Sequence, residues 1–433
     1  MKPAIIVRLA LSLILLNGIL YLCSARFLFI GTLDSPFFSI ALLSLFFILV
    51  RTSASLREFL ATLLLFTVLA ALEFRLLGYP STWPVWVSLL GMASLGVLFL
   101  RLVWAPPSQR RLAAFVLIPS LLFVVSEWFA SLFLFWTERF HPKVLDLYLY
   151  SFDASTRIQL PFLMGRLFLR FPALSFISVA AYIGLPVAIG LAFAGCVLRN
   201  PRTALAACVA FLITGPVGIL FYNLFPALGP VHLFEGRFPW DPLSLQQARH
   251  LFLEPVPLAG ARNAIPSLHA AWIFLVFWYT RDLSRLEKTI AALFVVFTLF
   301  ATLGTGEHYF VDLVVAVPFS LLILAFSNLL IGHQRFRQLF PLGIGLAGVL
   351  VWLMALQYAP LFFWRSPLIP WLACSVTVAA CYLAVKKVDG PSRSQPAAEL
   401  CLNSEASQEF FQMKTVRSSV PPVKIPVTER QTG

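Results

Sequence analysis

Two short segments, about forty residues apart, hold the side chains of this chain that are best suited to chemistry. Residues 262–269 read RNAIPSLH and end in His269, and residues 307–312 read EHYFVD and include His308. Each segment lies where a polar loop enters a long apolar run. Imidazole exchanges its proton near neutral pH, and its free nitrogen can also act as a nucleophile. The pair therefore indicates proton transfer and group transfer at one face of a membrane.

The residues beside His269 suit a phosphate group. Pro266 fits the first turn of a helix, where its missing N–H costs nothing, so we expect Ser267 and His269 within the first turn of an apolar helix. The free N–H groups of such a turn form a natural phosphate site. Ser267 could donate its hydroxyl to a phosphate oxygen, and the guanidinium of Arg262 could bind the same group with two N–H donors.

Asp312, four positions after His308, is well placed to act as its partner. Residues at this spacing share one face of a helix. A carboxylate there can accept a hydrogen bond from one imidazole nitrogen and leave the other nitrogen free to attack. Taken singly, His269 or His308 could be an interfacial residue that merely caps a helix. The presence of both, with Ser267 and Asp312, favours catalysis.

The composition is that of a membrane protein. Of 433 residues, 60% are hydrophobic and 12% are charged, and the mean hydropathy is +0.87, whereas soluble chains carry about 25% charged residues. We therefore predict an all-α, polytopic membrane protein. The net charge of +13 is spread in ones and twos between apolar runs, which suits membrane topology and lipid headgroups rather than nucleic acid. The six cysteines show no paired spacing, so we expect no metal site.

Apolar runs of about 20 residues, enough for a helix to cross a bilayer, predict about twelve transmembrane helices. Their expected ranges are 4–24, 31–50, 58–78, 82–104, 112–137, 174–198, 203–224, 266–281, 288–305, 309–331, 339–358 and 366–386. Arginine and lysine gather after every second span, which places both termini in the cytoplasm. Both histidine segments then lie on the outer side of what we expect to be a bacterial inner membrane.

Two long loops, 138–173 and 225–265, fall on the same outer side. In the first of them, Asp153 and Arg157 are four residues apart, which predicts an ion pair on the surface of a helix. The segment after Gly390 is rich in Ser, Pro, Gln and charge, so we predict a disordered cytoplasmic tail.

Three segments together resemble the signature motifs of the type 2 phosphatidic acid phosphatase superfamily. Pro-Ser-Leu-His at 266–269 is similar to the second motif, and His-Tyr-Phe-Val-Asp at 308–312 is similar to the third. Residues 222–230, YNLFPALGP, resemble the first motif region of the branch related to inositol phosphorylceramide synthases. That branch also has Leu in place of the Gly of the usual Pro-Ser-Gly-His. The resemblance covers roughly residues 112–332.

The resemblance implies a phosphoryl transfer on a lipid phosphate that needs no metal and no cofactor, carried out by a six-helix bundle. In this family pattern His308 would be the nucleophile that forms a phosphohistidine, and Asp312 would orient it. His269 would be the acid that protonates the leaving group. Ser267 and nearby basic residues, with Arg262 preferred, would hold the phosphate.

The chain departs from the superfamily pattern in three places. The Lys-(six residues)-Arg-Pro first motif is absent, which leaves Arg262, Arg237 and Arg249 as candidate phosphate-binding cations in that order. Ala301-Thr302 stands where Ser-Arg usually precedes the third motif. Glu307 stands where the branch often has a histidine, and it could face an acceptor hydroxyl or water, because a carboxylate repels phosphate.

These patterns divide the chain into accessory transmembrane helices (1–111), a catalytic domain (112–332), further accessory helices (333–388) and the tail (389–433). Either hydrolysis or transfer to an alcohol such as inositol fits the sequence, because both share the phosphohistidine step. The alternative is a twelve-helix secondary transporter, which would have similar halves and polar residues near the bilayer midplane. Here the polar residues cluster at one face, and no similarity between halves is apparent.

Overall fold

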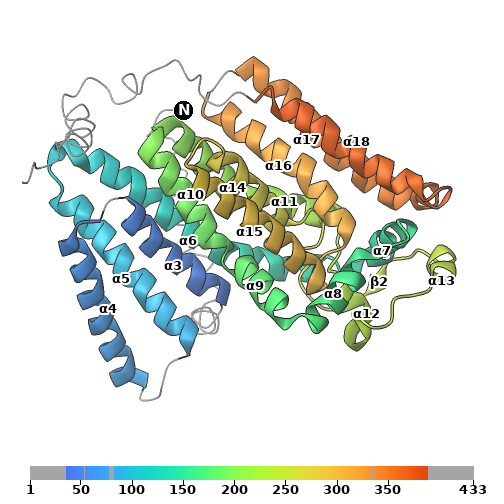
Figure 1. The fold of residues 1–433 in the computed structure, drawn as a ribbon, viewed down its shortest axis with the longest axis horizontal. Coiled ribbons are helices and arrows are strands. Elements are labelled where there is room, and N and C mark those ends of the chain that lie inside the picture. The colour runs from blue at the N-terminus through green and yellow to red at the C-terminus, as the bar shows by residue number, and fades with distance from the viewer. Residues whose placement is uncertain (1–35, 53, 78–81, 333–334, 389–433) are drawn as a thin grey trace, which may run out of the picture.

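Helices make up nearly all of the computed structural model, which describes residues 36–52, 54–77, 82–332 and 335–388 (Figure 1). The prediction of an all-α protein is confirmed for these residues. In this part of the chain the only strands are β1 (Lys143–Val144) and β2 (Val256–Pro257), which pair antiparallel. The predicted first span, 4–24, and the predicted tail, 389–433, lie outside the described residues.

Six of the described helices are long and apolar enough to cross a membrane. They are α5 (Trp83–Trp104), α11 (Pro201–Leu224), α15 (Arg285–Gly304), α16 (Phe310–Leu330), α17 (Arg335–Tyr358) and α18 (Leu368–Val385). The pair α8 (Leu160–Arg170) and α9 (Pro172–Ile183), bent by 118°, would make a seventh if it forms one span. Within the described ranges, the prediction of about twelve spans is therefore wrong.

Part of the error comes from apolar runs that fold as short or interrupted helices. The run 174–198 is divided between α9 and α10 (Leu185–Arg199) at Gly184, and Pro186 suits the first turn of the new helix. Helices α3 (Pro36–Arg51) and α14 (Leu268–Thr280) have only 16 and 13 residues. A helix needs about 20 residues to cross the hydrocarbon core, so apolar composition alone overcounted the spans.

The described helices form a central group with a layer on either side (Figure 1). Helices α10, α11, α14, α15 and α16 lie in the middle. On one side lie α3, α4 (Leu56–Leu77), α5 and α6 (Pro107–Phe140), and on the other side α17 and α18 run beside α16. The short helices α7 (Asp146–Ser155), α12 (Pro230–Phe234) and α13 (Leu245–Arg249) gather with α8 at one end.

Residues near the end of the described chain, in α17, the 3₁₀ helix η2 (Pro360–Trp364) and α18, hold α7 in place. The indole N–H of Trp364, in η2, donates to Ser151 Oγ at 3.0 Å. The indole N–H of Trp371, in α18, donates to the carbonyl of Thr156 at 3.2 Å. Phe152, on α7, packs edge-on against the rings of Trp352 and Phe363. Two directional hydrogen bonds and an aromatic cluster therefore hold α7 against α17, η2 and α18.

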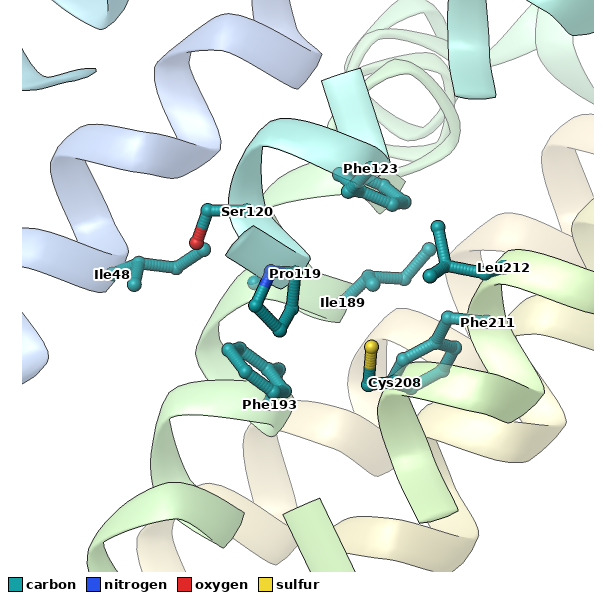
Figure 2. A pocket seen from close by; sticks show the side chains of 10 residues that line it. Ile48, Pro119, Ser120, Phe123, Ile189, Phe193, Cys208, Phe211 and Leu212 are labelled. Carbon is teal, nitrogen blue, oxygen red and sulfur yellow. The ribbon is translucent and has the colours of Figure 1, made fainter. Parts of the chain in front are cut away.

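A small apolar pocket lies between α3, α6, α10 and α11 (Figure 2). Its walls include Pro119, Phe193 and Cys208. Pro119 lies inside α6, where it removes one helical hydrogen bond. None of the site residues predicted from the sequence lines this pocket.

Candidate active site

Ser267 is the N-cap of α14. The helix begins at Leu268, and the Ser267 hydroxyl oxygen accepts a hydrogen bond from the N–H of Ala270 at 3.3 Å. Pro266 therefore precedes the helix rather than occupying its first turn, and Ser267 lies one residue earlier than expected. His269 is within the first turn, as predicted. Serine is a preferred N-cap because its oxygen satisfies an N–H that has no partner within the helix.

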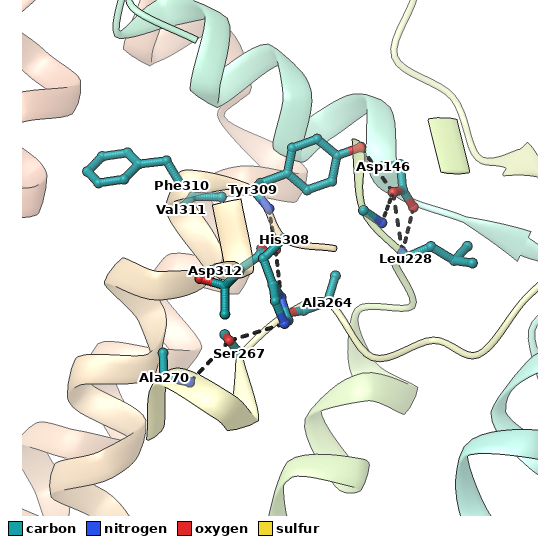
Figure 3. Close-up of polar contacts among 12 residues, drawn as sticks. Asp146, Leu228, Ala264, Ser267, Ala270, His308, Tyr309, Phe310, Val311 and Asp312 are labelled. Carbon is teal, nitrogen blue, oxygen red and sulfur yellow. Dashed lines mark hydrogen bonds and ion pairs between the residues drawn. The ribbon is translucent and has the colours of Figure 1, made fainter. Parts of the chain in front are cut away.

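The two predicted segments meet at His308. Its Nε2 lies 3.2 Å from Ser267 Oγ, so a hydrogen bond joins residues 41 positions apart (Figure 3). His308 is 2% exposed and Ser267 is fully buried. The fold thus brings the start of α14 and the segment before α16 to one place, as the sequence required.

The backbone fixes the proton on the His308 ring. Nδ1 lies 2.9 Å from the carbonyl oxygen of Ala264. A carbonyl oxygen can only accept, so Nδ1 carries the proton and donates it to Ala264. In the neutral ring Nε2 then has the free lone pair, and the Ser267 hydroxyl donates to it. His308 therefore presents an unprotonated nitrogen toward Ser267.

Asp312 lies beside the same ring nitrogen but is the more distant neighbour. Its Oδ2 is 3.4 Å from His308 Nδ1 and accepts a hydrogen bond from the N–H of Tyr309 at 2.8 Å. Asp312 is fully buried, and its Oδ1 has no hydrogen-bond partner among the described residues. The carboxylate is thus placed where it would stabilise a positive charge on the ring, while the Ala264 carbonyl holds the ring's orientation.

His269 lies in an aromatic setting. Its ring stacks on Tyr182 of α9 with centroids 3.9 Å apart and an interplanar angle of 16°. Trp272 approaches edge-on at 6.2 Å, and Phe37 lies at 5.7 Å. His269 is partly exposed and interacts electrostatically with His308. Across the described chain no hydrogen bond joins the two rings, so a group bound between them would be the natural link.

The Arg262 side chain bonds to backbone carbonyls of its own loop and of His141, at the end of α6. Its guanidinium donates to the carbonyl oxygens of His141 at 2.8 Å, Leu258 at 2.8 Å and Gly260. The side chain is buried, and its backbone N–H donates to Thr137 Oγ1 at 3.0 Å. These contacts make Arg262 an anchor of the segment that enters the site, and its binding of phosphate stays a prediction.

Arg237 and Arg249, the other candidate cations, are both exposed. The Arg237 guanidinium lies 5.8 Å from the centre of the Phe234 ring.

Asp146 is a buried carboxylate that the sequence analysis did not select. It accepts hydrogen bonds from the N–H groups of Leu228 at 3.0 Å and Gly229 at 2.9 Å, and from the Tyr309 hydroxyl at 3.0 Å (Figure 3). Gly229 has φ +153°, and a side chain there would collide with the carbonyl of Glu307. Glycine thus lets this loop approach the backbone that carries His308.

Asp153, on the same helix, holds the start of α16. Its carboxylate accepts from the N–H of Phe310 at 2.7 Å and of Val311 at 3.2 Å, and it is 2% exposed. The predicted surface ion pair with Arg157 is therefore wrong: Arg157 follows the end of α7 and lies over the Trp364 ring. Asp146 and Asp153 are seven residues apart, which is two turns of one apolar helix. This spacing places both carboxylates on the same face of the helix, and it was the sequence signal that could have identified them.

We expect the unfolding temperature to fall as the pH rises from about 5 to about 8, and to fall less in Asp146→Asn. Burial raises the pKa of Asp146 from its ordinary 3.8 to about 7, outweighing the hydrogen bonds from Leu228, Gly229 and Tyr309. The folded state then keeps a proton that the unfolded chain has lost. The resulting stability is complete below 3.8 and is lost as the pH rises through 7.

Thermal unfolding in detergent at several pH values measures this effect. The matched control is Asp282→Asn, because Asp282 has a side chain that is 52% exposed. The control should keep the wild-type pH dependence. An Asp146→Asn curve parallel to the wild-type curve would contradict the expectation.

Comparison with protein families finds one match within the chain. Residues 147–326 match the family model described as the PAP2 superfamily. The matched segment contains Asp153, Ser267, His269, His308 and Asp312, and it begins one residue after Asp146. The match supports the superfamily and gives no support to the particular branch related to inositol phosphorylceramide synthases. Comparisons with curated proteins and with solved structures found no match.

Proposed function

Since residues 147–326 match the family model of the PAP2 superfamily, we propose that this chain is a membrane enzyme that transfers the phosphoryl group of a lipid phosphate through His308. The superfamily implies phosphatase-type phosphoryl transfer on lipid phosphates. The observation that carries the residue assignment is the geometry of the His308 ring. Nδ1–H is held by the Ala264 carbonyl, so the Nε2 lone pair faces Ser267 at the meeting point of the two segments.

In the first step Nε2 of His308 attacks the phosphorus atom. The N–P bond forms while the bond from phosphorus to the leaving oxygen breaks, and His269 gives that oxygen a proton. The ring becomes positively charged, and the Asp312 carboxylate at 3.4 Å from Nδ1 stabilises this charge. The products of this step are the free alcohol and a phosphohistidine.

Ser267 has two roles in this scheme. Before the reaction its hydroxyl donates to Nε2 of His308, 3.2 Å away. When a phosphate enters, the hydroxyl can turn to a phosphate oxygen and release the lone pair for attack. Phosphoryl transfer depends mainly on positioning and charge neutralisation, and a hydroxyl fixed at an N-cap supplies the positioning.

In the second step an acceptor oxygen attacks the phosphorus atom of the phosphohistidine, and the unprotonated His269 removes the proton of that oxygen. The new O–P bond forms while the N–P bond breaks, which returns His308 to its neutral form. Water as acceptor gives hydrolysis and inorganic phosphate. An alcohol such as inositol gives transfer. Both outcomes use the same catalytic residues, so the product depends on whether water or an alcohol can reach the phosphorus atom.

We place the reaction at the outer face of the membrane. Arg281, Arg285 and Lys288 lie where α14 ends and α15 begins. His269 and His308 lie at the opposite ends of these two helices, and basic residues favour the cytoplasmic side.

The alternative, a secondary transporter, rested on twelve spans. The described residues contain six candidate spans, or seven with the bent pair, which removes that support. The site residues also meet at the ends of α14 and α16, not halfway along a helix. Phosphoryl transfer therefore remains the better proposal.

The test is a phosphate-release assay with purified protein in EDTA. A panel of lipid monophosphates and diphosphates is offered with and without inositol, and both inorganic phosphate and phosphorylated inositol are measured. We expect turnover in EDTA, because the proposed nucleophile and acid are both protein side chains. Turnover of no lipid phosphate, with folded protein and a full panel, would count against an enzyme of this class.

A further inference from the structure

We propose that α7 is the positioning element of the nucleophile: its carboxylates Asp146 and Asp153 fix the backbone around Tyr309 and thereby aim Nε2 of His308. The inference rests on the proposed function, since it assigns the role of two residues in the same reaction. Both are positioning residues, because neither carboxylate bonds to His308 itself.

Asp153 fixes the segment directly after His308. The first N–H groups of a helix have no partner within it, and α16 begins at Phe310. Asp153 accepts from the N–H of Phe310 at 2.7 Å and of Val311 at 3.2 Å. A carboxylate at this position also complements the positive end of the helix dipole. The start of α16 is therefore attached to α7.

Asp146 fixes the same segment through a side chain. The Tyr309 hydroxyl donates to Asp146 at 3.0 Å, while two backbone N–H groups, of Leu228 and Gly229, donate to the same carboxylate. The N–H of Val231 donates to the carbonyl of Gly306 at 2.9 Å. The backbone is thus held on both sides of His308, at Gly306 before it and at Tyr309 after it.

The construction differs from an ordinary helix start. Helix α15 is capped locally by Ser284, whose hydroxyl accepts from the N–H of Glu287. At α16 Asp312 also accepts locally, from the N–H of Tyr309. In addition the hydroxyl of Tyr309, the N-cap residue, donates to Asp146, and two of the helix N–H groups bond to Asp153. In the described chain neither carboxylate forms an ion pair with a lysine or arginine. Two buried carboxyl groups from another helix go beyond capping, because they also fix the distance between α7 and the His308 segment.

The experiment measures single-turnover rate constants with enzyme in excess over a lipid phosphate that wild-type protein cleaves. When the enzyme is also saturating, a smaller folded fraction leaves the rate constant unchanged, whereas a misplaced nucleophile lowers it. We expect Asp153→Asn to lower the rate constant by about 10- to 100-fold, because displacements near 1 Å cost that much. The matched control, Ser284→Ala, removes the local cap of α15 and should keep the wild-type rate constant.

Tyr309→Phe is the second variant. It deletes only the hydroxyl that bonds to Asp146. It therefore tests the positioning role of α7 even if Asp153→Asn does not fold. A reduced single-turnover rate constant supports the inference, and wild-type rate constants in the folded variants overturn it. His308→Ala separates the two proposals. If that variant keeps activity, the proposed function fails; if it is inactive while Tyr309→Phe and Asp153→Asn are unaffected, only the role of α7 fails.

Discussion

Alanine in place of His308 is expected to reduce turnover of lipid phosphate by about 10⁴-fold or more, the scale of losing a covalent nucleophile. The residue supplies the attacking nitrogen, and neither Ser267 nor Asp312 can replace it. Two measurements check the expectation: steady-state phosphate release, and trapping of the phosphorylated enzyme by alkaline quench after labelling with a radioactive substrate. The label should be absent from His308→Ala.

His250→Ala is the matched control for this experiment. His250 is an exposed histidine in the loop after α13, so its loss removes the same side chain without touching the site. Wild-type turnover and labelling are expected. Labelled protein in His308→Ala, or turnover within a few-fold of wild type, would show that another residue accepts the phosphoryl group.

Loss of His269 is expected to have the second largest effect, and the size of the effect should depend on the leaving group. General acid catalysis contributes about 10²- to 10⁴-fold when the leaving group needs a proton. His269→Ala should therefore lose activity of this order with an alkyl phosphate. A nitrophenyl phosphate releases a stable anion without a proton, so its cleavage should be much less affected.

The comparison of the two substrates is the decisive measurement. His308→Ala should lose activity with both, since both need the nucleophile, and it serves as the reference. Equal losses with the alkyl and the nitrophenyl substrate in His269→Ala would contradict its role as the acid. They would instead indicate that the ring, stacked on Tyr182, supports the shape of the site.

The meeting of the two histidine segments could be predicted from the sequence, but the atomic partners could not. Residue types and spacing were enough to predict that Ser267 and His308 share one site. In the structure Ser267 Oγ lies 3.2 Å from His308 Nε2. The four-residue spacing also placed Asp312 beside the ring. The closest partner of Nδ1 is nevertheless the carbonyl of Ala264. A backbone carbonyl is present at every residue, so no side-chain pattern identifies the one that bonds.

The number of spans was wrong because composition does not determine where a helix stops. The residues of α14 are as apolar as those of a span, yet the helix has 13 residues. Between α9 and α10 a break at Gly184 divides one long apolar run. Such boundaries depend on local backbone geometry and on tertiary packing, which override hydropathy.

Burial explains why the partners of two charged residues could not be predicted from the sequence. Arg262 has the chemistry of a phosphate ligand, but in the fold its guanidinium meets three backbone carbonyls. Asp153 has the spacing of an exposed ion pair with Arg157, yet it points inward to the N–H groups of Phe310 and Val311. A charged side chain is usually exposed, and only the fold reveals which ones are buried to satisfy backbone groups.

The attachment of α7 to Trp364 and Trp371 has a consequence for the extent of the working enzyme. The segment that matches the superfamily stops at residue 326, whereas the indole groups that hold Ser151 and Thr156 come from η2 and α18. A recombinant fragment trimmed to the family boundaries would leave both acceptors unpaired and uncover Phe152. The last two long helices are thus better regarded as a brace that keeps α7 in position than as an appendage that can be removed.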